Sequence, residues 1–234
     1  MSDDPVAHRH RTIAELDNWR HQIDVGHGVV TPGTRDLSAD ARHLGLPRDL
    51  TGKRVLDVGA SDGWFSFTCE DAGATDILAI DDLSSTLNAE RNGFTIAAEL
   101  RESKARFEAC DVVDLDPERH GQFDLILFLN VLYHLPNPML ALERLAAVLA
   151  PGGTLLLKTY FRSDVRVWFR GRAFQFDIDR RPKAWFFPND ELAGDPTNWW
   201  GPNRRCIEAF LEAVGLESEM LAVDGDRVYY AAKK

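Results

Sequence analysis

Short apolar runs alternate with segments of helical period through the middle of this chain. The runs are rich in Val, Ile, Leu and Phe and occupy residues 54–58, 76–80, 105–109, 123–129 and 153–160. Segments with the spacing of amphipathic helices lie at residues 63–73, 84–102 and 137–149. Runs that are apolar throughout are typical of strands buried on both faces. The alternation therefore predicts an α/β fold with a doubly wound, mostly parallel sheet.

The alternation stops after residue 160 and resumes near residue 203. A helix is predicted over 203–214, and two strands near 217–223 and 226–232 meet at the turn Asp224-Gly225-Asp226. These strands would complete a seven-stranded, Rossmann-like sheet with an antiparallel pair at its C-terminal end.

The same pattern divides the chain into parts. We expect an N-terminal helix and flap in residues 1–50, with the helix at 11–22, and a core in residues 51–234. Residues 161–202 show no sustained period and are rich in Trp and Phe. We interpret them as an insertion that forms a lid.

Composition excludes several classes of protein. The chain has 234 residues, which suits one large α/β domain. It contains no apolar stretch long enough for a secretory signal or a membrane span, so we expect a cytoplasmic protein without a membrane partner. Its three cysteines form no CxxC pair, and no metal site is expected. The net charge of −10 argues against a protein that mainly grips a nucleic-acid backbone.

A glycine-containing loop, Gly59-Ala60-Ser61-Asp62-Gly63, follows the first predicted strand. Ligands of open α/β sheets bind at the carboxyl ends of the strands, where this loop lies. A dinucleotide site has the pattern Gly-x-Gly-x-x-Gly, whereas this loop has Ser61 in place of the second glycine and a different spacing. Asp62 would also repel a diphosphate. A nucleotide-dependent oxidoreductase is therefore only an alternative.

Three carboxylates lie at successive strand ends. Asp57, within the first strand, suits a ligand with an ammonium group. Asp81 ends the second strand, where it can accept hydrogen bonds from both hydroxyls of a ribose. Asp111 follows the third strand and could accept from an adenine amino group.

Five motifs occur in the order expected of one enzyme family. They are "VLDVGASDG", "AIDD", "CDVVDL", "FDLILFLNVLYHL" and "LAPGGTLLLKT", and the likeness that they carry covers about residues 52–160. In this order they resemble the class I S-adenosylmethionine-dependent methyltransferases. The resemblance implies S-adenosyl-L-methionine as cofactor. The residues that would bind it are Asp57, Gly59, Ala60, Ser61, Gly63, Asp81, Asp82, Leu83, Asp111, Val112 and Asn130.

A narrower resemblance extends to the C-terminus. The stretches "NVLYHLPNPMLALERL", "AWFFPN" and "DRVYYAAKK" are similar to the family that modifies tRNA wobble uridine by carboxymethyl transfer, and to its relatives that methylate small molecules. In the tRNA enzymes a carboxylated cofactor is bound by a Tyr, an Arg near the C-terminus and a Lys ahead of the core. Tyr133 and Arg227 match the first two, and no Lys matches the third. Ordinary S-adenosylmethionine is therefore expected.

Three residues after the fourth predicted strand are candidates for catalysis. His134 could remove a proton from the acceptor, because an imidazole titrates near neutral pH. A capping or packing role for His134 remains open. Asn130 could orient the acceptor or bind the cofactor's ammonium group through its carbonyl, and Tyr133 could face either donor or acceptor.

The insertion is the predicted acceptor-binding region. Between Phe161 and Trp185 lie seven basic residues and three acidic ones, which favours an anionic acceptor. The aromatic residues among them could form an apolar or stacking wall, or they could simply fill a small lid while the arginines stay solvated. The predicted acceptor-binding residues are Tyr160, Arg162, Trp168, Arg172, Trp185 and Arg227.

These patterns predict a transferase. We expect methyl transfer to an oxygen or nitrogen of a small anionic or aromatic acceptor, of the kind found in specialised metabolism, by a monomer or homodimer. Methyl or carboxymethyl transfer to tRNA wobble uridine is the first alternative. A cofactor-binding protein without turnover is another.

Overall fold

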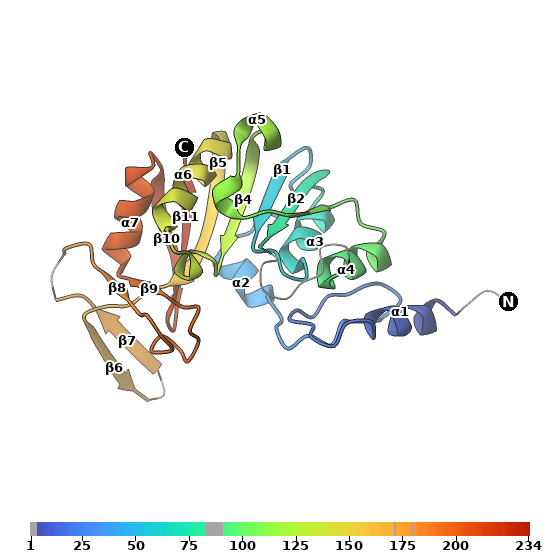
Figure 1. Ribbon diagram of the computed structural model, residues 1–234, viewed down its shortest axis with the longest axis horizontal. Helices are drawn as coiled ribbons and strands as arrows, with labels where there is room; N and C mark the ends of the chain where they lie inside the picture. The colour runs from blue at the N-terminus through green and yellow to red at the C-terminus, as the bar shows by residue number, and fades with distance from the viewer. Residues whose placement is uncertain (1–3, 83–90, 171, 179) are drawn as a thin grey trace. The chain divides into compact units, whose positions relative to one another are not determined.

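The computed structural model describes residues 4–82, 91–170, 172–178 and 180–234 (Figure 1). Its main sheet has seven strands in the order β10-β11-β5-β4-β1-β2-β3. The pairs β1–β2, β2–β3 and β4–β5 are parallel, whereas β11 pairs antiparallel with both β5 and β10. The predicted fold class is confirmed. The chain forms two compact units, Met1–Val112 and Val113–Lys234, which are described in turn.

The first unit contains one half of the alternating pattern. Its elements are α1 (Pro5–Ile13), α2 (Ser38–His43), β1 (Arg54–Val58), α3 (Trp64–Asp71), β2 (Asp76–Asp81), α4 (Gly93–Arg101) and β3 (Arg106–Ala109). Val55, Leu56 and Val58 of β1 are buried, as expected of a strand that is covered on both faces. Helix α3 contacts both β1 and β2.

The prediction of an N-terminal helix at 11–22 is wrong. Helix α1 instead begins after Asp4, whose carboxylate accepts a hydrogen bond from the Val6 N–H at 3.1 Å, and Pro5 occupies its first turn. It ends at Ile13, and the chain beyond it is irregular because its buried Trp19 packs into the unit's core. The indole N–H of Trp19 donates to the Ile13 carbonyl at 3.1 Å. Helix α2 was not predicted.

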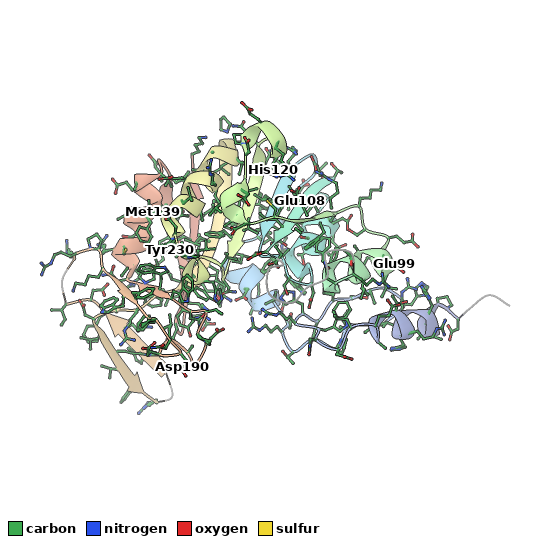
Figure 2. The ribbon with its side chains drawn as sticks, in the orientation of Figure 1. Glu99, Glu108, His120, Met139, Asp190 and Tyr230 are labelled. Carbon is green, nitrogen blue, oxygen red and sulfur yellow. The ribbon has the colours of Figure 1, made fainter. Side chains whose placement is uncertain are left out.

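The second unit holds the remaining strands of the sheet and the insertion. A short 3-10 turn, η1 (Val112–Asp114), leads into it. Its helices are α5 (Pro117–His120), η2 (Leu132–His134, a 3-10 turn), α6 (Pro138–Val148) and α7 (Arg204–Ala213). Its sheet strands are β4 (Phe123–Leu129), β5 (Leu149–Tyr160), β10 (Glu217–Asp224) and β11 (Arg227–Lys233). Tyr230, labelled in Figure 2, is fully buried on β11 and its hydroxyl contacts Glu208 of α7.

The insertion forms two small antiparallel strand pairs. They are β6 (Val165–Phe169) with β7 (Arg172–Phe176), and β8 (Ala184–Phe186) with β9 (Trp200–Pro202). Phe169, Phe174 and Phe176 are each at least half exposed, so the first pair does not bury its aromatic residues in a core. Within the described ranges, no helix has the length and apolarity needed to cross a bilayer.

Candidate functional site

The loop after β1 is a tight turn built from left-handed backbone. Gly59, Ser61 and Gly63 have φ values of 70°, 52° and 90°. A side chain at such a φ costs about 1 kcal/mol, so Ser61 stands where glycine is favoured. The N–H groups of Gly59 and Ala60 both donate to the carbonyl of Ile80 at the end of β2. These bonds fix the loop against the carboxyl ends of two strands.

Asp57 and Asp81 form an acidic pair beside this loop. Asp57 is 3% exposed, and its carboxylate accepts from the Ser66 hydroxyl of α3 at 2.7 Å. Burial and, to a smaller extent, the nearby charge of Asp81 raise the pKa of Asp57 to about 6, although the hydrogen bond from Ser66 opposes them. Asp81 accepts from the Ser61 N–H at 2.8 Å, and burial also raises its pKa. A buried and a half-buried carboxylate that repel each other create a place where a cation would be stabilised.

Asp62 joins the loop to the N-terminal strap, which we define as residues 19–35. The carboxylate of Asp62 is 5% exposed and accepts from the backbone N–H groups of Arg20 and His21 at 2.6 and 2.8 Å. A β-carbon at Gly93 would collide with this carboxylate, so α4 also begins against it. The sequence predicts only that Asp62 repels a diphosphate, and nothing near it in the sequence indicates this long-range role.

The strap brings basic groups to the loop. The charge of Arg20 lowers the pKa of Asp81, which opposes the effect of burial. Burial lowers the pKa of His21, and its Nδ1 atom has no hydrogen-bond partner among the described residues. A buried polar atom without a partner is uncommon and indicates a site that a ligand could complete.

The other predicted cofactor residues of this unit are placed as follows. Asp111 comes two positions after β3 and is half-buried, whereas Val112 is buried. Asp82 is exposed directly after β2, and Leu83 lies outside the described residues.

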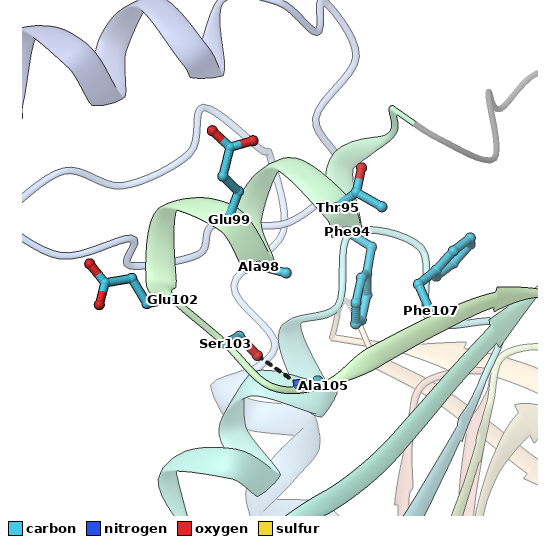
Figure 3. Close-up of a pocket in the computed structure, with 8 residues that line it drawn as sticks. All are labelled: Phe94, Thr95, Ala98, Glu99, Glu102, Ser103, Ala105 and Phe107. Carbon is cyan, nitrogen blue, oxygen red and sulfur yellow. Dashed lines mark hydrogen bonds between the residues drawn. The ribbon is translucent and has the colours of Figure 1, made fainter.

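A separate hollow of about 490 Å³ lies between α4 and β3 (Figure 3). Phe94 and Phe107 line it, with Glu99 and Glu102 among its lining residues, and none of the predicted site residues takes part. Glu99 is already paired with Arg91 at 2.5 Å. The hollow is therefore not the site indicated by the loop.

In the second unit, the end of β4 is strained. Asn130 has a φ of 60°, and its N–H donates to the Lys158 carbonyl of β5 at 2.8 Å. Its side-chain oxygen is buried and has no hydrogen-bond partner within the described part of the chain. Left-handed backbone at a non-glycine residue combined with an unpaired buried oxygen is typical of functional positions.

Tyr133, Tyr160 and Arg227 form a compact cluster, the tyrosine–arginine cluster. The two tyrosine rings are 5.1 Å apart and nearly perpendicular, and both residues are buried. The Arg227 guanidinium lies 3.4 Å from the centroid of Tyr160 and 5.3 Å from that of Tyr133. No carboxylate in the described ranges forms an ion pair with Arg227. Its charge is thus stabilised by aromatic faces and available to an anion.

His134 lies beside this cluster at the end of η2. Its ring is 4.3 Å from the Tyr133 ring, and its Nδ1 atom contacts Thr197, which lies in the loop between β8 and β9. Residue types alone did not indicate Thr197, which is 63 positions away along the chain.

The basic residues of the insertion have different partners: some form ion pairs with carboxylates and others lie against aromatic rings. Arg166 pairs with Asp226 at 2.6 Å and Lys183 with Asp164 at 2.8 Å, so part of the predicted positive charge is neutralised. Arg162 lies over the Phe187 ring at 5.4 Å. Trp168 and Arg172 belong to β6 and β7, and Trp185, which is half-buried, lies opposite Gly201 in the β8–β9 pair.

A family profile described as a methyltransferase domain matches residues 34–217. This chain belongs to the methyltransferase-domain family. The match covers the loop, both acids of β1 and β2, the η2 turn and the insertion, and it confirms the family predicted from the five motifs.

Curated relatives of this methyltransferase-domain chain include proteins named for a small-molecule pathway and proteins named for tRNA modification. The ubiquinone biosynthesis O-methyltransferase of Bordetella avium is 33% identical over 119 residues, which are 50% of this chain and 47% of the relative. The tRNA U34 carboxymethyltransferase of Campylobacter hominis is 33% identical over 176 residues, 75% of this chain and 54% of the relative. The chain therefore spans about half the length of these relatives. The predicted resemblance to the wobble-uridine enzymes is confirmed.

The N-terminal domain of EvdMO1, solved in the presence of SAH and D-fucose, has the same fold. Its TM-score is 0.68 at 21% identity, and the alignment covers 98% of this chain and 96% of that domain. At this identity the likeness concerns the fold alone.

Proposed function

We propose that the chain transfers a methyl group from S-adenosyl-L-methionine to an oxygen or nitrogen of a small anionic or aromatic acceptor. The observation that carries this proposal is the acidic pair Asp57 and Asp81 beside a left-handed loop, in a chain of the methyltransferase-domain family. A phosphate-bearing dinucleotide would be repelled by these carboxylates, whereas a cationic amino-acid nucleoside would be attracted to them.

The residues of the first unit fit such a donor. Asp57 would face the ammonium group, because a buried carboxylate with a raised pKa gains most from a cation. Asp81 has one oxygen on the Ser61 N–H and would offer the other to the ribose hydroxyls. Asp111 and Val112 would bind the adenine. S-adenosylmethionine supplies an activated methyl group, so the protein's task is orientation and exclusion of water.

The second unit supports an anionic acceptor. Arg227 presents a cation on aromatic faces, where a carboxylate or phenolate could form a charge-assisted hydrogen bond with it. Asn130, with its unpaired buried oxygen, would orient a hydrogen-bond donor of the acceptor. Tyr160, Arg162, Trp168, Arg172 and Trp185 stay as further predicted contacts.

Calorimetric titration tests the donor. We expect binding of S-adenosylmethionine and S-adenosylhomocysteine and none of NAD, with Asp57→Asn and Asp81→Asn each weakening binding. Equal affinity in both variants, or preference for NAD, would overturn the proposal. Release of S-adenosylhomocysteine with a panel of phenolic, carboxylic and amine acceptors then separates an enzyme from a protein that only binds the donor.

A second candidate is modification of tRNA wobble uridine by methyl or carboxymethyl transfer. The observation that favours it is the contact between Tyr133 and Arg227, the two residues that the narrower resemblance implies for a carboxylated donor. Relatives such as that of Campylobacter hominis carry this activity in their names. Mass spectrometry of the purified protein decides between the donors: carboxy-S-adenosylmethionine bound in preference to the plain form would favour the second candidate.

A further inference from the structure

We propose that Asp195 and Thr197 position His134 as a general base, by holding its ring with the proton on Nδ1 and the lone pair on Nε2. The inference rests on the proposed function for its chemistry, because only a methyltransferase with a protonated acceptor needs such a base. The arrangement itself lies within the second unit and depends on hydrogen bonds of its own.

The donor and acceptor roles of the groups around Nδ1 determine the tautomer of His134. Nδ1 lies 2.9 Å from the Thr197 carbonyl oxygen, which can only accept. It also lies 3.0 Å from the Thr197 hydroxyl oxygen. That hydroxyl donates its proton to the Asp195 carboxylate at 2.7 Å, so it presents a lone pair to the histidine. Both neighbours are acceptors, and Nδ1 must therefore be the donor.

The loop that carries these acceptors is fixed to the η2 turn at several points. Asp195 also accepts from the Thr197 N–H at 2.9 Å, which closes a turn around the pair. The Trp199 N–H donates to the Tyr133 carbonyl at 2.9 Å, and the Trp200 indole donates to the Leu135 carbonyl at 2.9 Å. Asn198, which directly follows Thr197, is 4% exposed, and its side-chain amide donates to the Leu192 carbonyl. The position of Thr197 is therefore set by residues on either side of His134.

This geometry suits the removal of a proton from the acceptor. The acceptor's oxygen or nitrogen forms the new bond to the methyl carbon as the carbon–sulfur bond breaks, and that electron pair stays on sulfur. The acceptor's proton goes to Nε2 of His134. The resulting imidazolium donates to the Thr197 carbonyl, and the negative charge of Asp195 stabilises it through the Thr197 hydroxyl.

The tautomer can be measured without any ligand. Nitrogen-15 NMR of the full chain, at a pH well above the titration of histidine, distinguishes protonated from unprotonated ring nitrogens. We expect the Nδ1–H form for His134. In Asp195→Ala the Thr197 carbonyl still accepts from Nδ1, but the Thr197 hydroxyl can now donate to it, so the Nε2–H form should gain population relative to wild type. A wild-type His134 in the Nε2–H form, or identical tautomer populations in wild type and Asp195→Ala, would overturn the proposal.

Kinetics test the positioning role. We expect Thr197→Val and Asp195→Ala to lower kcat about tenfold while the KM of the donor and its calorimetric affinity stay unchanged. Thr197→Ser should restore most of the rate because it keeps the hydroxyl. Asp190→Ala is the matched control, since Asp190 lies on the same loop (Figure 2) and its carboxylate has no described contact with His134.

The outcomes separate the two proposals. Absence of donor binding in the wild type would refute the proposed function and leave the NMR result on the tautomer standing. Normal donor binding and turnover with unchanged kcat in Thr197→Val and Asp195→Ala would refute the positioning role alone.

Discussion

The loop of the first unit and the η2 turn of the second are assembled in different ways. Gly59, Ser61 and Asp81 lie within 23 residues of one another, and strand β1 delivers the loop directly to its acidic partner. His134 depends on Thr197 from a loop 63 positions later. A site built from one β-α-β unit is visible in local sequence, whereas a site built by an insertion depends on tertiary contacts.

The largest effect should come from Asp62, which joins the loop of the first unit to the distant N-terminal strap. In Asp62→Ala the N–H groups of Arg20 and His21 lose their acceptor, which should cost about 2 to 6 kcal/mol, because each unpaired donor shielded from water costs about 1 to 3 kcal/mol. Urea unfolding and amide hydrogen exchange at these two residues measure the loss.

Two variants serve as controls for Asp62→Ala. Asp62→Asn keeps one acceptor oxygen and should lose less, while Asp17→Ala changes an exposed residue and should stay within about 0.5 kcal/mol of wild type. If amide hydrogen exchange in the strap of Asp62→Ala is the same as in wild type, the loop of the first unit does not hold the strap in place, and this prediction is wrong.

The next effect concerns the buried acid of β1. Because the pKa of Asp57 is raised from 3.8 to about 6 by folding, its contribution to stability is present at low pH and is lost as pH rises between about 4 and 6. Asp57→Asn should remove this pH dependence and raise the free energy of unfolding at neutral pH by on the order of 2 kcal/mol. It should also weaken donor binding about tenfold, as expected when a charged partner is lost.

Urea titrations at several pH values measure the predicted gain in stability of Asp57→Asn, and calorimetry measures its predicted loss of donor affinity. In the wild type, donor affinity should rise as pH increases from about 5 to 7, because the ammonium group prefers the ionised carboxylate. A variant that is less stable than wild type at neutral pH would contradict the account.

A smaller effect is expected in the tyrosine–arginine cluster. Arg227→Ala should raise the KM of an anionic acceptor about tenfold and leave donor affinity unchanged, because one charge-assisted hydrogen bond is worth about 1.5 kcal/mol or more. Arg144→Ala, at an exposed position of α6, is the control. Steady-state kinetics with charged and neutral analogues of one acceptor would show whether the effect follows the charge.

The smallest effect concerns Ser61. Ser61→Gly relieves a left-handed conformation and should stabilise the protein by up to about 1 kcal/mol, partly offset by the greater freedom of glycine in the unfolded chain. Donor affinity should not change, because the backbone N–H to Asp81 is kept. Ser61→Ala retains the β-carbon and should give no gain in thermal unfolding, which separates strain from the loss of the hydroxyl.

Most of the central sheet followed from the sequence, and parts of the periphery did not. Strands such as β1 and β4 are predictable because a short run of consecutive apolar residues is typical of a strand that is covered on both faces. The segment 11–22 has the local pattern of a helix. Its conformation differs because Trp19 is buried in the core and the N–H groups of Arg20 and His21 donate to Asp62 instead of to carbonyls within a helix. The insertion has no helical period because it forms strands whose phenylalanines remain exposed.

The sequence by itself determined the alternation of strands and helices in the central sheet, the acidic ends of β1 and β2 and the residues of the loop, because these depend on neighbours within a few positions. Only the tertiary structure placed Asp62 under the strap, Arg227 on two tyrosine rings and Thr197 against His134. These contacts join residues that are distant in the chain, and hydrogen-bond direction and burial exist only after the chain has folded.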